Sequence, residues 1–139
     1  MTAKEFLQDI YKKRQALETT QNKIEQLRVS AEGVGAIRYD KDRVQTSPED
    51  HMSEAVAQMV ELENEYERMI LAYHKSIILR TKMIDDMDDP RYVRLLMLRY
   101  VDCLRFEEIA CRMAYSWQHV LRLHGEALDA FARQYEGQY

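Results

Sequence analysis

The sequence predicts an all-α protein, and three observations support this fold class. The 139 residues include only four glycines and two prolines, the residues that most often interrupt helices. Hydrophobic residues make up 46% of the chain, which is enough for a core, and charged residues make up 32%. Apolar residues recur at spacings of three and four along most of the chain, as they do in amphipathic helices.

A first helix is expected to begin after Thr2, because Thr2 and Glu5 have the spacing of a capping box. Two nearby glycines, Gly33 and Gly35, should end it. Its apolar stripe is narrow and partly polar, which suits a coiled-coil partner. The stripe consists of Phe6, Ile10, Leu17, Ile24, Leu27 and Ala31, with Lys13 and Thr20 in the remaining seam positions.

No period is sustained over residues 32–48, which are expected to form a connecting loop. This loop is long for a helical hairpin. Two interpretations stay open for it. It is either a flexible tether or an ordered loop that contacts DNA or a partner through Lys41, Arg43 and Gln45.

A second, longer helix should follow, capped by Ser47 or Asp50. Glu61, Glu63, Glu65 and Glu67 scatter around it and should form a solvated acidic face. Two helices with facing stripes predict a long antiparallel, coiled-coil-like hairpin. The second stripe has heptad spacing, with Glu63 and Arg80 as polar interruptions, and consists of Met52, Val56, Met59, Tyr66, Ile70, Tyr73, Ile77, Ile84 and Met87.

The four acids before Pro90 oppose the dipole of the second helix, and Pro90 itself disfavours helical geometry at Asp89. We therefore expect a domain boundary here. Residues 1–89 form the helical hairpin, with its loop at about 32–48, and residues 90–139 form a second domain. The spacing in that domain predicts three short helices, of which the last two make a helix-turn-helix. Its inner faces should hold Ile109, Ala110, Met113, Val120, Leu123 and Leu128.

The chain shows no sign of secretion, membrane insertion or catalysis. Its start lacks a signal peptide, and no stretch is apolar enough to span a membrane, so a cytoplasmic location is expected. Cys103 and Cys111 are interpreted as reduced, buried, small hydrophobic residues. His119 and His124 are five residues apart and do not share a helix face, so surface or groove histidines are expected instead of metal ligands. No enzyme, cofactor, metal or small-molecule substrate is expected.

The formal net charge is −4, so any contact with DNA must be local. After Pro90 every basic residue is an arginine, and arginine suits phosphates and guanine edges. These arginines are Arg91, Arg94, Arg99, Arg105, Arg112, Arg122 and Arg133.

One set of residues in the C-terminal domain forms a known pattern: Leu95, Leu98, Arg99, Tyr100, the stretch Phe106-Glu107-Glu108-Ile109-Ala110, Tyr115, Ser116, Val120, Ala127 and Leu128. At these residues the domain resembles region four of the sigma-70 family, which reads promoter DNA, and the whole chain is similar to small phage and prophage regulators of the ArpU and RinA type. The resemblance implies a winged-helix-like, sigma-region-four domain and a phage transcription regulator.

The resemblance makes Ser116 the cap of a recognition helix whose next residues would read bases. Where sigma factors tend to place Arg and Glu, this chain has Trp117 and Gln118, and the turn position often held by glycine is Ala114. Trp117 would contact a thymine methyl or a sugar, or else pack against the hairpin or a dimer partner. The expected DNA-binding residues are Ser116, Trp117, Gln118, His119, Leu121, Arg122, Gly125 and Arg105.

Two functions are therefore predicted from the sequence. The first is a sequence-specific, sigma-like transcription regulator that binds promoter DNA, engages RNA polymerase or oligomerises through the hairpin, and forms a homodimer. The second is a coiled-coil interaction or assembly factor, for instance in DNA packaging, whose C-terminal unit serves for packing.

Gly125 within a helix should mark close approach of the backbone to a phosphate or to a neighbouring helix.

Overall fold

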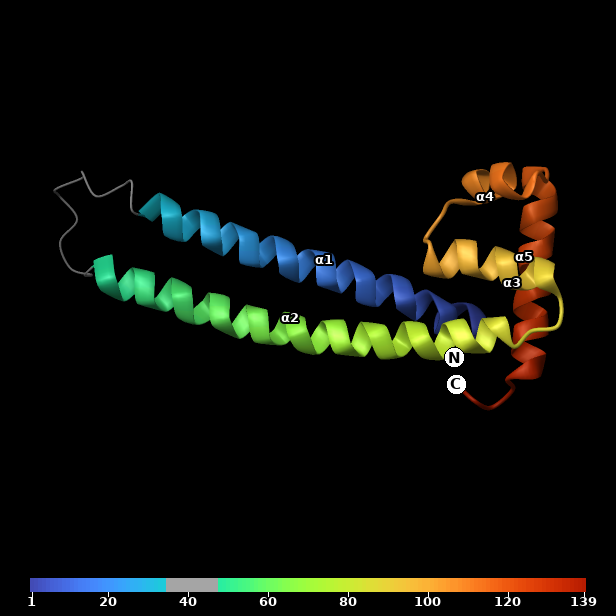
Figure 1. Ribbon diagram of the computed structural model, residues 1–139, viewed down its shortest axis with the longest axis horizontal. Helices are drawn as coiled ribbons and strands as arrows, with labels where there is room; N and C mark the ends of the chain where they lie inside the picture. The colour runs from blue at the N-terminus through green and yellow to red at the C-terminus, as the bar shows by residue number, and fades with distance from the viewer. Residues whose placement is uncertain (35–47) are drawn as a thin grey trace. The chain divides into compact units, whose positions relative to one another are not determined.

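A computed structural model describes residues 1–34 and 48–139, with side chains described for 1–31 and 53–139 (Figure 1). This part of the chain contains helices and turns but no strands, so the all-α prediction is confirmed for it. None of its helices is long and apolar enough to cross a membrane. The elements are α1 (Ala3–Val34), α2 (Pro48–Asp85), α3 (Pro90–Leu96), the π-helix η1 (Met97–Val101), α4 (Phe106–Met113) and α5 (Trp117–Gln134).

The predicted start of α1 is confirmed. The Thr2 N–H donates to Oε2 of Glu5 at 2.7 Å, and the Glu5 N–H donates to Oγ1 of Thr2 at 3.2 Å. This reciprocal pair satisfies two backbone donors that have no partner inside the helix. α1 ends at Val34, within the predicted stop. The expected loop, with Lys41, Arg43, Gln45 and the Ser47 cap, lies outside the described residues.

The described chain divides into two compact units. One unit holds residues 1–13 and 73–139, and the other holds residues 14–72. At the expected domain boundary, residue 89/90, the structure has the break between α2 and α3. Asp89 caps α3, since its side chain accepts the Arg91 N–H at 2.9 Å.

In the unit of residues 14–72, α1 and α2 lie side by side (Figure 1). Leu17, Thr20 and Ile24 of the predicted α1 stripe are buried. The Thr20 hydroxyl lies 3.5 Å from Sδ of Met69 on α2, so the polar seam position has a partner across the interface. The predicted acidic face is confirmed, because Glu61, Glu63, Glu65 and Glu67 are all exposed.

The heptad assigned to α2 is only partly right. Ile84 is fully buried, Ile77 and Ile70 are half-buried, but Glu63 and Val56 are exposed, Val56 by 50%. An α-helix with 3.6 residues per turn drifts by about 20° per heptad relative to a strict seven-residue repeat. The row that runs from Ile84 to Val56 in steps of seven therefore rotates toward solvent, and Val56 does not belong to the buried stripe. The parallel row stays half-buried at Tyr73, Tyr66 and Met59.

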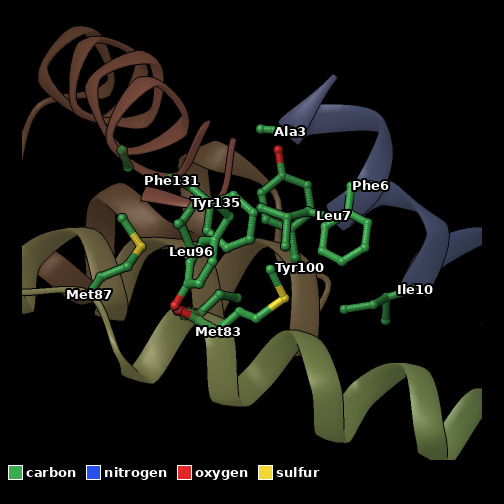
Figure 2. Packing of buried hydrophobic residues seen from close by; sticks show 12 residues of the cluster. Ala3, Phe6, Leu7, Ile10, Met83, Met87, Leu96, Tyr100, Phe131 and Tyr135 are labelled. Atoms are coloured by element: carbon green, nitrogen blue, oxygen red, sulfur yellow. The ribbon is translucent and has the colours of Figure 1, made fainter. Parts of the chain in front are cut away.

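The main core lies in the unit of residues 1–13 and 73–139 (Figure 2). The first turns of α1 and the last turns of α2 contribute to it, together with α3, η1 and α5. The Phe6 ring stacks on Tyr139 with ring centroids 4.9 Å apart, which brings the two ends of the chain together. The largest fully buried members of this core are Leu7, Ile10, Ile84, Leu96, Tyr100 and Phe131.

Arg80, expected as a polar interruption, is a buried side chain with several partners. Its Nε–H donates to the Phe6 carbonyl at 2.7 Å, and its Nη2–H donates to Oδ2 of Asp9 at 2.9 Å. Its guanidinium also lies 4.1 Å from the centroid of the Phe6 ring and donates to Ser76. Burial lowers the Arg80 pKa, and Asp9 opposes that change. Arg80 thus joins the end of α2 to the start of α1.

The first of the three short helices predicted after Pro90 changes from α-helical to π-helical geometry at Met97. The backbone N–H of Asp102 bonds to the carbonyl of Met97 at 3.0 Å, five residues earlier, which is π-helical spacing. The Tyr11 hydroxyl donates to the Arg99 carbonyl at 2.6 Å within this widened turn. Beyond it, Cys103 has a left-handed φ of 57°.

The two cysteines were expected to be buried, and that prediction is wrong. Cys103 is half-buried and Cys111 is exposed, and both are free thiols. Cys111 lies on the face of α4 opposite the buried side chains Ile109 and Met113, so it contributes nothing to the core.

Candidate nucleic-acid interface

α4 and α5 pack on each other through a second apolar cluster with Leu95 of α3. Ile109, Ala110 and Met113 are buried on α4, and Val120 and Leu123 on α5, as the sequence predicted. Small Ala110 at this contact allows the two helices to approach closely. Leu128 is only half-buried, and its neighbour Ala127 occupies the fully buried position.

The turn between these helices is short, and backbone hydrogen bonds tie it to the end of α4. Ala114 ends α4 in the left-handed conformation, with φ 56° and ψ 41°. The Tyr115 N–H donates to the Ala110 carbonyl at 3.0 Å, and the Ala114 N–H donates to that of Cys111 at 3.3 Å. Ser116 then caps α5, since its Oγ accepts the His119 N–H at 3.1 Å. The chain changes direction between α4 and α5 within three residues, and the two caps fix the start of α5.

The first turns of α5 expose the residues expected to read bases. Trp117 is 51% exposed, and Gln118 and Arg122 are exposed beside it. The first turn of α5 contains no acidic residue, so its positive N-terminal dipole is not opposed by a carboxylate of its own. Leu121 and His119 are half-buried.

The His119 ring contacts the ring of Tyr115 edge-on, with centroids 4.4 Å apart. This contact explains why His119 is half-buried although it belongs to the exposed end of the helix. The structure therefore brings Trp117, Gln118 and Arg122 together at the surface, whereas His119 and Leu121 form the edge of that surface.

Arg105 and Gly125 have different surroundings. Arg105 precedes α4, its side chain is 83% exposed, and its Nε lies 4.0 Å from Oε1 of Glu108. Gly125 is exposed, and a Cβ built on it would meet no atom within 4 Å among the described residues. Close approach of a neighbouring helix therefore does not explain this glycine in the described part of the chain.

His124 was expected at the surface or in the groove, and that expectation is wrong. Its exposed fraction is 9%, and its Nε2 lies 2.8 Å from the Tyr100 hydroxyl. Phe106 contacts the ring edge-on at 4.9 Å. Residue 124 is four positions after Val120 and three before Ala127, both buried, so the helical period does place it on the inner face of α5.

The described residues offer no group of three or more His, Cys, Asp or Glu side chains that could hold a metal ion. The surface at the start of α5 instead combines an aromatic ring, an amide and a guanidinium. Comparisons with protein families, with curated proteins and with solved structures find no match to this chain.

Proposed function

We propose that the chain is a sequence-specific DNA-binding transcription regulator of a phage or prophage, sigma-factor-like, with α4 and α5 as a helix-turn-helix. The observation that supports it most is the exposure of Trp117, Gln118 and Arg122 together, directly after the capped turn. In helix-turn-helix proteins the N-terminal residues of the second helix contact base edges in the major groove.

Each exposed side chain has chemistry suited to this role. The Gln118 amide can pair with the N6 and N7 atoms of adenine, and the Arg122 guanidinium can donate to N7 and O6 of guanine. The Trp117 ring can pack on a thymine methyl group or a sugar. Ser116 positions these residues through its cap, and Leu121 supports them from the edge of the packed face.

In this proposal α1 and α2 form an antiparallel helical hairpin that carries the DNA-binding unit, pairs two copies into a homodimer and offers a surface to RNA polymerase. A dimer would place two α5 helices on two half-sites. Mass measurement by light scattering tests the dimer, which a purely monomeric protein at micromolar concentration would contradict.

The test of DNA binding is a selection of bound sequences from random duplexes, made with wild type, Gln118→Ala and Arg122→Ala. Loss of a base-reading residue should relax the preference at one position, at a cost of about 1–3 kcal/mol. Ser53→Ala, an exposed change in the other compact unit, is the matched control and should leave the selected motif unchanged. A folded wild type that enriches no sequence would refute the proposal.

The second candidate function is a coiled-coil interaction or assembly factor. Exposed apolar side chains on α2, in the unit of residues 14–72, favour this function, because Leu71 is 62% exposed and Val60 is 48% exposed. A stable complex with a protein other than RNA polymerase, lost in Leu71→Ser and kept in Arg122→Ala, would support this function over the first.

A further inference from the structure

Two arginines from different helices meet beside the turn that precedes α5. The Nη2–H of Arg94, on α3, donates to the backbone carbonyl of Arg112, in the last turn of α4, at 3.1 Å. Both side chains are exposed. Tyr115 follows Arg112 in the turn, and its ring contacts His119 at the start of α5.

Neither arginine is neutralised by an acid. Among the described residues, no carboxylate forms an ion pair with Arg94 or Arg112, whereas Arg91 pairs with Asp89 at 2.9 Å and Arg105 approaches Glu108. The Arg94 guanidinium therefore lies at the end of α4 that carries Arg112, and neither arginine has a carboxylate to compensate its charge among the residues that the structure describes. Two uncompensated arginines at one helix end favour the binding of an anion.

Stabilisation of the α4 C-terminus explains only part of this arrangement. Arg94 does bond to one of the last carbonyls of α4, which satisfies a free acceptor and complements the negative end of the helix dipole. That bond uses one of the five N–H groups of Arg94. The Arg112 side chain has no hydrogen bond or ion pair within the described chain, so helix stability does not account for it.

We propose that Arg94 and Arg112 form a phosphate-binding site for one DNA strand, alongside the groove that α5 enters. This inference rests on the proposed DNA-binding function and adds to it two residues that carry no base specificity. The remaining guanidinium N–H groups suit phosphate oxygens, because arginine can donate two parallel hydrogen bonds to them. Such contacts would position α5 without reading sequence.

The test measures the affinity for a labelled duplex carrying the selected sequence, and for a scrambled duplex, at several potassium chloride concentrations. Each phosphate contact contributes about 0.9 to the slope of log affinity against log salt. Arg94→Ala and Arg112→Ala should each lower that slope by about this amount and weaken both duplexes by the same factor. Arg112→Lys, which keeps the charge, should restore most of the slope.

Arg133→Ala is the matched control, since it removes one exposed arginine of α5 whose Nε–H donates to the carbonyl of Asp129 in its own helix. It should leave the slope nearly unchanged. Arg112→Ala is the decisive variant. It keeps the backbone carbonyl to which Arg94 bonds, so the thermal unfolding temperature should not change and any change in the salt slope reports on DNA binding. If the wild type binds DNA and both arginine variants keep the salt slope of the wild type, the phosphate site is refuted while the DNA-binding function stands. Absence of binding by folded wild type would overturn the DNA-binding function together with it.

Discussion

The Tyr100 hydroxyl lies 2.8 Å from Nε2 of His124, and the two rings stack with centroids 5.8 Å apart. Tyr100 belongs to the π-helix η1 and His124 to α5, so this bond joins two elements of the main compact unit. Burial lowers the His124 pKa to about 4 and raises the Tyr100 pKa to about 12. At neutral pH both groups are uncharged, so the hydroxyl and Nε2 share a hydrogen bond between two neutral partners.

The protein should lose stability in mild acid because His124 is buried in its neutral form. The unfolded chain takes up a proton near pH 6.5, whereas the folded chain does so only near pH 4. Neutral His124 therefore contributes fully to the free energy of unfolding above pH 6.5. This contribution is lost as the pH falls toward 4, and the loss is at most about 3 kcal/mol. Urea unfolding followed by circular dichroism from pH 7.5 to 4 measures this loss.

His124→Leu removes the titrating group and should flatten the pH dependence between 6.5 and 4, although its stability at neutral pH is lower because the Tyr100 hydroxyl loses its partner. His119→Gln is the matched control, a second histidine of α5 that is only half-buried. An unchanged acid sensitivity in His124→Leu would contradict the assignment.

Arg80 should be one of the most sensitive positions of α1 and α2. Arg80→Ala leaves the Phe6 carbonyl without its donor and leaves Asp9 with only Lys13 as an ion-pair partner, so we expect a loss of about 2–4 kcal/mol. Thermal and urea unfolding measure it. Arg68→Ala, an exposed arginine on the same helix, serves as the comparison and should change stability by less than about 0.5 kcal/mol. Equal effects of the two variants would contradict the role of Arg80.

The sequence predicted the features that depend on local pattern. The capping box of Thr2 and Glu5 and the inner residues Ile109 and Met113 follow from spacing along one helix, and the structure confirms them. The Ser116 cap was implied by the family resemblance, and the structure confirms it too. The buried position of His124 was available from the same periodicity, but a histidine does not count as apolar in such a pattern.

Features that depend on contacts between distant residues were not predictable in this way. The Arg80 partners Phe6 and Asp9 are more than seventy residues away in sequence, and only the packing of α1 on α2 brings them together. The π-helical turn at Met97 likewise has no residue signature. It shifts hydrogen bonds by one residue while Tyr11 and His124 hold Arg99 and Tyr100 from other helices.

Ala114→Gly should stabilise the protein, because alanine pays a steric cost at a φ of 56° that glycine does not. Glycine also has greater freedom in the unfolded chain, and this offsets part of the gain. The expected net increase in the free energy of unfolding is about 0.5–1 kcal/mol. Ala130→Gly is the matched control. This is the same chemical change inside α5, where it should destabilise by about 0.5–1 kcal/mol. Chemical unfolding that gives the two variants the same sign would contradict the role of the turn.

Gly125→Ala separates stability from DNA binding. A Cβ at this position meets nothing within 4 Å, and glycine inside a helix costs about 0.5–1 kcal/mol relative to alanine, so the variant should be more stable by that amount. If the exposed backbone of α5 approaches a phosphate at this glycine, as the sequence predicted, the added methyl group should weaken duplex binding while the melting temperature rises. Ala132→Gly, a helical change farther along α5, tests whether helix stability alone alters binding and should leave the affinity unchanged. If Gly125→Ala and the wild type bind the duplex equally well, Gly125 does not contact DNA. The destabilisation that glycine causes inside α5 would then have no functional explanation.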